Sequence, residues 1–239
     1  MCGRYVQVAS PDLLAEHFHL DEIATEPHQA DYNVTPRRSV YAIVRREPEV
    51  RTLESMRWGL VPSWAKDPKI GDRLINARAE TVADKPAYRR AFRKRRCIVP
   101  ADGFYEWQAR PRAGTTKSPK QPMFIHRRDG EPLAFAGLWE AWRDPDDADA
   151  PWLTSCVILT TRANDVLAPI HDRMPVVLAE PNWATWLDPG APDIAALEPL
   201  LVPAPSEWFE AYPVSTRVNK PTNNSADLVV QVEPETRFR

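Results

Sequence analysis

Short apolar runs, separated by polar or proline-containing turns, recur along most of this chain. Runs of this length that are rich in aliphatic and aromatic residues predict β-strands. They occupy residues 40–44, 53–58, 97–99, 103–107, 123–126, 133–138, 156–160, 176–178 and 212–216. The pattern therefore predicts a protein made mainly of short strands.

Four segments instead predict short helices. In the first, Ser10 is a typical N-cap residue, Pro11 suits the first turn, and the apolar residues that follow continue to Phe18. The other three span residues 86–94, with Tyr88 and Phe92 on the inner side, 181–187 and 194–201. Because all four are short, we expect them at the periphery of a β core.

The 239 residues are not divided by an internal repeat or a low-complexity segment. Two loops, residues 109–122 and 143–151, are expected to be solvated excursions between strands rather than domain boundaries. Proline outnumbers glycine by 25 to 8, which favours rigid loops and strands that end at prolines over long helices. We predict one α+β domain over residues 2–239, with a curved or barrel-like, mostly antiparallel β core and short peripheral helices.

Composition favours a reducing, aqueous compartment. No apolar run is long enough to span a bilayer, and the N-terminus lacks the basic and apolar regions of a signal peptide. Three cysteines, Cys2, Cys97 and Cys156, are too few and of the wrong parity for a disulfide framework, and their spacing does not suggest a metal site. We expect a cytoplasmic protein without a metal, in which Cys97 and Cys156 are inert core residues.

A net charge of −2 argues against a protein that coats nucleic acid through its overall charge. A local basic groove is still compatible with that charge, because the local field decides binding. The basic run 89–96 is expected either to contact phosphate or to form a solvated face. Among nine tryptophans, Trp58, Trp64 and Trp107 lie near polar segments, where aromatic faces beside arginines could stack unpaired bases. Most of the nine are expected in the core.

The first residues offer a nucleophile that no internal position can supply. Removal of Met1, which is usual before a small second residue, leaves Cys2 with a free α-amine and a thiol on adjacent carbons. Ordinary pKa values of about 8 and 8.5 leave a usable fraction of both groups deprotonated at neutral pH. With an aldehyde, the amine forms a Schiff base and the thiol then closes a five-membered thiazolidine. The alternative is an incidental residue at a frayed terminus.

Polar residues inside apolar segments mark further candidates, because burying an unpaired polar group costs about 1–3 kcal/mol. Asn76, Arg78 and Glu80 would share one face of an extended segment, which either lines a site or is a solvent-facing edge with a local ion pair. Glu106 ends an apolar run, where burial would raise the pKa of its carboxyl, unless the side chain faces outward. His171 lies at a junction of core and surface, suited to proton transfer or to a structural role.

Seven motifs follow one another along nearly the whole chain. They are Met1-Cys2-Gly3-Arg4-Tyr5, Tyr32-Asn33-Val34-Thr35-Pro36, Trp58-Gly59-Leu60-Val61-Pro62-Ser63-Trp64, Ile75-Asn76-Ala77-Arg78-Ala79-Glu80-Thr81, Pro100-Ala101-Asp102-Gly103-Phe104-Tyr105-Glu106-Trp107, Ala136-Gly137-Leu138-Trp139-Glu140 and Ile170-His171-Asp172-Arg173-Met174-Pro175. In this order they resemble the SRAP family, the SOS-response-associated peptidases that shield abasic sites in single-stranded DNA. Each motif alone is weakly specific, whereas all seven in order are highly specific.

The resemblance implies the SRAP fold, single-stranded DNA with abasic sites as the partner, and neither a cofactor nor a membrane; we expect a monomer. It implies that Cys2 forms the thiazolidine with the abasic deoxyribose and that Asn76 holds the reacting sugar. It also implies that Glu106 handles protons at the Cys2 amine and that His171 promotes opening of the sugar ring. The residues that resemble the family's DNA contacts are three arginines toward phosphates, Arg4, Arg78 and Arg173, and two tryptophans toward bases or a junction, Trp64 and Trp107.

Two other functions remain open from the sequence. Cys2 with His171 could serve a cysteine peptidase or N-terminal-nucleophile hydrolase, including autoproteolytic processing of the N-terminus, as the family name implies. This reading needs an oxyanion hole and a peptide groove, neither of which the sequence identifies. The other possibility is a noncovalent single-strand binding module in which Cys2 is incidental.

Overall fold

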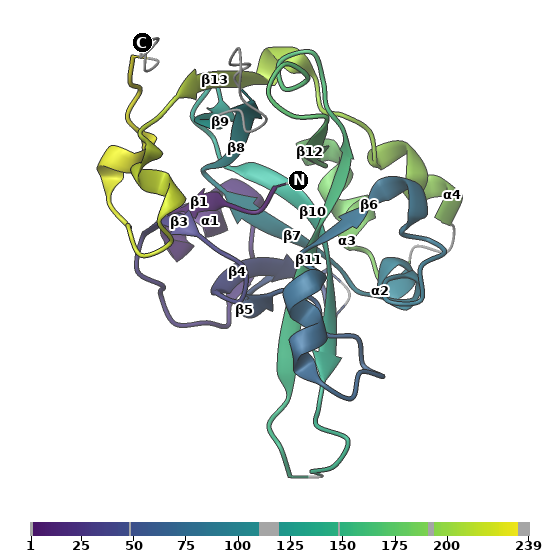
Figure 1. The fold of residues 1–239 in the computed structure, drawn as a ribbon. Coiled ribbons are helices and arrows are strands. Elements are labelled where there is room, and N and C mark those ends of the chain that lie inside the picture. The colour runs from purple at the N-terminus through teal and green to yellow at the C-terminus, as the bar shows by residue number, and fades with distance from the viewer. Residues whose placement is uncertain (1, 48, 110–119, 148, 191–193, 234–239) are drawn as a thin grey trace.

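The computed structural model describes residues 2–47, 49–109, 120–147, 149–190 and 194–233 (Figure 1). Its strands are β1 Tyr5–Gln7, β2 Glu22–Ile23, β3 Asp31–Val34, β4 Ser39–Val44, β5 Thr52–Trp58, β6 Asn76–Arg78, β7 Arg96–Ala101, β8 Gly103–Ala109, β9 Lys120–Arg127, β10 Leu133–Trp142, β11 Leu153–Arg162, β12 Arg173–Pro175 and β13 Phe209–Pro213. The α-helices are α1 Pro11–Phe18, α2 Arg89–Lys94, α3 Trp183–Leu187 and α4 Ile194–Leu197. None of the helices in the described ranges is long and apolar enough to cross a membrane.

The strands form two sheets, and one of them closes on itself. A five-stranded sheet has the order β13-β9-β8-β1-β3, and an eight-stranded sheet has the order β12-β11-β10-β7-β4-β5-β2 with β6 added to β11. An additional parallel pairing of β11 with β5 closes β11, β10, β7, β4 and β5 into a ring of five strands. The predicted fold class, α+β with a barrel-like and mostly antiparallel core, is therefore confirmed.

Alternation along the ring strands separates two hydrophobic clusters. In β4, Val40 and Ala42 belong to a cluster shared with the five-stranded sheet, whereas Tyr41 and Ile43 belong to one shared with the helices. Figure 1 shows α2, α3 and α4 on one side of the sheets and the C-terminal segment on the other. The helices are thus peripheral, as predicted.

Helix α1 begins where the sequence indicates. The Ser10 side chain accepts a hydrogen bond from the backbone N–H of Leu13 at 3.3 Å, and Pro11 occupies the first turn. Leu14 and Phe18 are buried, whereas Leu13 is largely exposed. An N-cap and an i, i+4 apolar pair account for a helix of this length.

Two predicted strands are wrong in position. Residues 176–178 do not form a strand with β11; instead β12 ends at Pro175, and Val177 makes an isolated bridge with Phe135 of β10. Val176 still donates to the Leu159 carbonyl of β11 at 2.9 Å, while its own carbonyl accepts from Ala136 of β10 at 2.9 Å, so the segment changes partner at Val176. The last strand begins at Phe209 and ends at Pro213, before the predicted end at residue 216. The chain there enters a 3₁₀ turn capped by the Ser215 side chain.

Each of the two predicted loops lies between two strands that pair as a hairpin. Strands β8 and β9 pair up to Ala109 and Lys120, and residues 110–119 lie outside the described part of the chain. Residues 143–147 and 149–151 lie between β10 and β11, residue 148 is outside the described part of the chain, and the β10–β11 hairpin projects from the body of the molecule (Figure 1). Strands β1, β2 and β3 were not predicted, because they are short and lack a long apolar run.

Candidate active site around Cys2

Cys2 lies just ahead of β1 and is fully buried. Strand β1 runs between β3 and β8 and pairs antiparallel with β8 at Tyr5 and Phe104. The backbone N–H of Tyr105 donates to the Arg4 carbonyl at 3.0 Å, so this register carries Glu106 toward the start of the chain. The sheet therefore brings the N-terminal cysteine and the carboxyl of Glu106 to one place.

Asn76 holds the backbone of Cys2 from the opposite sheet. Strand β6 runs parallel to β11, with Asn76 opposite Ile158. Its Nδ2 donates to the Cys2 carbonyl at 2.7 Å. Its Oδ1 is buried and has no hydrogen-bond partner among the described residues. An unpaired buried acceptor is costly, so this oxygen is suited to accept a hydrogen bond from a bound molecule.

Glu106 and His171 form the acid–base part of the site. Glu106 is 3% exposed, which rejects the outward-facing alternative, and burial raises the pKa of its carboxyl while the nearby His171 opposes that rise. His171 Nε2 lies 4.0 Å from Glu106 Oε2. On the other side of the ring, the backbone N–H of Arg173 donates to Nδ1 at 3.0 Å, with an Asp172 carboxylate oxygen 2.9 Å from Nδ1. These two neighbours favour opposite roles for Nδ1, because the backbone N–H needs an acceptor and the carboxylate needs a donor; Nε2 is the ring nitrogen that faces Glu106.

The thiol of Cys2 is held in its protonated form. Burial raises its pKa far above the ordinary value, and the negative charge of Glu106 raises it further. A cysteine peptidase requires the opposite, a thiolate stabilised by a neighbouring imidazolium. The same burial raises the pKa of Cys97 and takes that of Cys156 to about 12, as expected for inert core thiols.

Arg4 and Trp107 lie together at one side of the site. The Arg4 guanidinium donates to Asn33 Oδ1 and to the Val218 carbonyl, each at 2.7 Å, and its carbon lies 5.8 Å from the Trp107 ring centre. Trp107 Nε1 donates to Asn219 Oδ1 at 2.7 Å. Sequence reasoning gave no role to Asn33, which is buried and also donates to three C-terminal carbonyls. Only its place in one of the seven motifs marked it.

Arg78 and Trp64 line a groove that starts at Asn76. Its volume is about 600 Å³, and Lys85 and Tyr88 are among the other residues that line it. Arg78 is exposed, and 60% of the Trp64 surface is exposed. Both predicted DNA contacts are therefore beside the site and accessible.

Arg173 is also beside the site, but its guanidinium is occupied by protein groups. It makes a two-point ion pair with Glu80 at 2.7 and 2.9 Å and donates to the Thr160 carbonyl at 2.5 Å. Glu80 does not share a face with Asn76 and Arg78, because the extended segment ends at Arg78 and Glu80 lies in a 3₁₀ turn.

The basic run 89–96 divides into two kinds of arginine. Arg95 forms an ion pair with the buried Glu140. Arg96 is 2% exposed and donates to backbone carbonyls, so it is a structural residue. The remaining basic side chains of the run are exposed, and they are Arg89, Arg90, Arg93 and Lys94.

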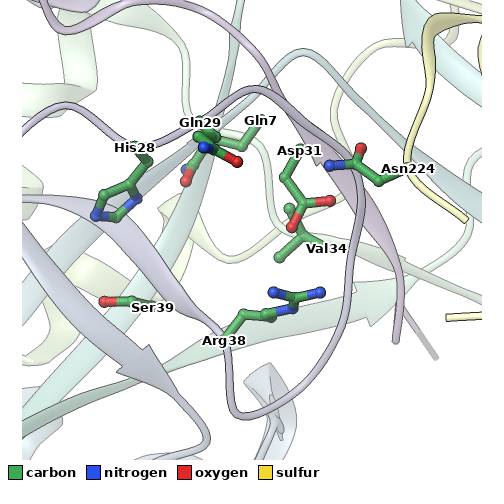
Figure 2. A pocket seen from close by; sticks show the side chains of 8 residues that line it. All are labelled: Gln7, His28, Gln29, Asp31, Val34, Arg38, Ser39 and Asn224. Carbon is green, nitrogen blue, oxygen red and sulfur yellow. The ribbon is translucent and has the colours of Figure 1, made fainter. Parts of the chain in front are cut away.

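A separate polar hollow of about 290 Å³ lies beside β1, β3 and β4, and Figure 2 shows its lining side chains. The His28 ring stacks on Tyr41 with 4.2 Å between ring centres and shares a hydrogen bond with Ser55 at 2.9 Å. Buried Gln7 uses both ends of its amide on backbone groups. These wall residues are thus engaged with the protein. Within the described ranges, no group of three or more His, Cys, Asp or Glu side chains could hold a metal ion.

The fold and the site define an α+β protein whose N-terminal cysteine is set among an amide, a carboxyl and an imidazole. The chain belongs to the SRAP family, because the model of the SOS response associated peptidase (SRAP) family matches residues 1–221. It is 41% identical over 230 residues to the abasic site processing protein YoqW of Bacillus subtilis, covering 96% of this chain and 99% of that protein.

Two further similarities are to a protein of another bacterial species and to a solved structure. The abasic site processing protein YedK of Escherichia coli is 32% identical, over 97% of this chain and all of that protein. A crystal structure of a protein from Bacteroides thetaiotaomicron superposes with a TM-score of 0.84 at 25% identity, covering 97% of this chain and all of that one.

Proposed function

We propose that this protein processes abasic sites in single-stranded DNA by forming a covalent thiazolidine with them through Cys2. The observation that carries the proposal is that four separate segments bring Cys2, Asn76, Glu106 and His171 together in one site, in which Cys2 and Glu106 are buried. The relatives named abasic site processing proteins supply the substrate class.

The proposed reaction begins at the amine. An abasic deoxyribose is in equilibrium with an open-chain aldehyde, and His171 Nε2 could move the proton that opens the ring at O4′. Once Met1 is removed, Glu106 takes a proton from the Cys2 ammonium, and the amine adds to the aldehyde carbon. Loss of one water gives the imine. The buried acceptor Asn76 Oδ1 is placed to hold a sugar hydroxyl.

The thiol then completes the link. Its sulfur adds to the imine carbon while its proton passes to the imine nitrogen, which becomes the thiazolidine amine. The raised pKa of the thiol explains this order, since a protonated thiol leaves the first attack to the amine. Reversal would pass that proton from the nitrogen back to the sulfur as the carbon–sulfur bond breaks and the imine re-forms, and the Glu106 carboxyl is available to carry the proton. The Schiff base is the lyase-like stage of the reaction.

The decisive experiment compares abasic and intact single-stranded oligonucleotides on a denaturing gel. We expect a heat- and detergent-stable adduct with abasic DNA alone, and its loss in Cys2→Ala. Cys2→Ser keeps the amine and should leave only an imine that borohydride traps. An undiminished adduct from Cys2→Ala would eliminate the thiazolidine mechanism.

A matched control tests the amine. A residue added before Cys2 converts the amine to an amide, whose delocalised nitrogen cannot form an imine. Such a protein should bind single-stranded DNA but gain no mass in intact mass spectrometry after denaturation. A retained mass equal to the DNA component would mean that another residue is the nucleophile. Binding without any adduct, even in the mature protein, would instead identify a noncovalent single-strand binding module.

A further inference from the structure

Glu80 is not among the four residues assigned to the chemistry. It forms an ion pair with Arg173, which is 93 positions away in the sequence. It belongs to the 3₁₀ turn Ala79–Thr81 that follows β6 directly, so it is four residues from Asn76. Its two carboxylate oxygens accept from Arg173 Nη1 and Nη2 at 2.7 and 2.9 Å. A two-point arginine–carboxylate pair fixes orientation as well as distance.

The pair passes over strand β11 at Thr160. Thr160 lies opposite Arg78 of β6 on one side and opposite Pro175 of β12 on the other. The Arg173 guanidinium also donates to the carbonyl of Thr160 at 2.5 Å and to its hydroxyl at 3.3 Å. The arginine side chain is only 14% exposed. The Glu80–Arg173 pair therefore links strand β6, which carries Asn76, to the segment that carries His171, across strand β11.

Arg173 also contacts the imidazole of His171 through its own backbone N–H. The N–H of Arg173 donates to His171 Nδ1 at 3.0 Å, and this hydrogen bond orients the ring. Nε2 is the atom that lies 4.0 Å from Glu106 Oε2. Movement of Arg173 would therefore change the direction of the ring and with it the position of Nε2.

We propose that Glu80 is a positioning residue: by holding the Arg173 guanidinium across β11, it fixes the turn that presents His171 Nε2 to Glu106. The inference rests on the proposed function, because its effect is measured on the reaction with abasic DNA. This inference also gives Arg173 a role other than the phosphate contact expected from the sequence: it positions His171 before DNA binds.

The test measures the single-turnover rate of adduct formation at saturating abasic DNA, together with affinity for intact single-stranded DNA. We expect Glu80→Gln and Glu80→Ala to lower the rate by roughly ten- to hundredfold, because a displacement of about 1 Å has effects of this size. Affinity should stay within about threefold, and Glu80→Asp, which keeps the charge, should recover part of the rate. Glu54→Gln removes another two-point pair, with Arg46, and should keep the wild-type rate.

A double-mutant cycle separates positioning from a general structural effect. In a His171→Ala background, Glu80→Gln should cause little further loss of rate, since both changes remove the same contribution. An equal loss in both backgrounds would show that Glu80 acts through the fold as a whole, and would overturn the proposal. Tighter DNA binding by Glu80→Ala would overturn it too, because Glu80 would then be competing with phosphate for Arg173.

The outcomes also distinguish this inference from the proposed function. If the mature wild-type protein forms no adduct, the proposed function fails. If the wild type reacts and Glu80→Gln reacts equally fast, only the role of Glu80 is rejected.

Discussion

At the scale of single residues, the site contains a carboxyl that the fold does not favour in its charged form. Glu106 is buried, and burial raises its pKa; the nearby His171 offsets only part of this rise. Each pKa unit corresponds to about 1.4 kcal/mol of preference for the protonated form. A raised pKa makes a carboxyl better suited to exchange protons in this site, at the expense of stability.

Glu106→Gln should therefore stabilise the protein in a pH-dependent way. Below the pKa of an unfolded glutamic acid, Glu106 is protonated in both states and the substitution gains little. As the pH rises from there through the raised folded-state pKa, the wild type loses stability relative to the variant. Urea unfolding between pH 4 and pH 8 measures this difference. A difference that does not change with pH would contradict the assignment, and adduct formation should slow in the same variant.

At the scale of elements, the side chain of Arg96, the first residue of β7, hydrogen-bonds the C-terminal ends of helices α2 and α3. Its Nη1 donates to the carbonyls of Phe92 and Arg93 at 2.7 Å, at the end of α2. Its Nε donates to the backbone carbonyl of Trp186 at 2.6 Å, and its Nη2 donates to the backbone carbonyl of Asp188. Both carbonyls lie at the end of α3. Burial lowers its pKa to about 10. The last carbonyls of both helices, which lack helical partners, are thus satisfied by one side chain.

Arg96→Lys should destabilise the protein by about 2–4 kcal/mol, because a single ammonium cannot reach carbonyls at two helix ends and leaves some of them unpaired. Arg93→Lys, at an exposed neighbour, is the matched control and should change stability by less than about 0.5 kcal/mol. Chemical unfolding measures both. Equal stability of the two variants would show that the Arg96 contacts contribute little.

Elements with strong local patterns were predictable from the sequence, and elements defined by partners were not. Helix α1 and strands β4 and β5 carry their caps and apolar runs within their own residues. Strands β6 and β12 have three residues each and exist only because β11 pairs with both. For the site, Cys2 and Glu106 were marked by unusual local settings, whereas the pairing of Glu80 with Arg173 spans 93 positions and leaves no local trace.

At the scale of the whole molecule, a net charge of −2 gives no general attraction to DNA, so affinity has to come from local cations. Arg78 is exposed in the groove that begins at Asn76 and is free to meet a phosphate. Arg4 and Arg173 already donate to protein acceptors. In the proposed function, we therefore expect Arg78 to supply the larger part of the salt-dependent contact with DNA near the abasic site.

Arg78→Ala should weaken binding of single-stranded DNA and lower the slope of log affinity against log salt by about 0.7, the value for one phosphate contact on a single strand. The exposed Arg128, in the turn after β9, offers a control, and Arg128→Ala should leave the slope unchanged. Binding titrations at several salt concentrations measure both. An unaltered slope in Arg78→Ala would place the phosphate track elsewhere.

In the proposed function Cys2 reacts through a free amine, and the burial of this residue bears on when during synthesis Met1 is removed. The N-terminus leaves the ribosome first, whereas Asn76, which bonds the Cys2 carbonyl, follows 74 positions later. Glu106 and His171 follow later still. Cys2 is therefore unenclosed while the nascent chain is incomplete and fully buried in the folded protein. In the proposed function, an aminopeptidase is expected to expose the amine of Cys2 before the fold encloses this residue.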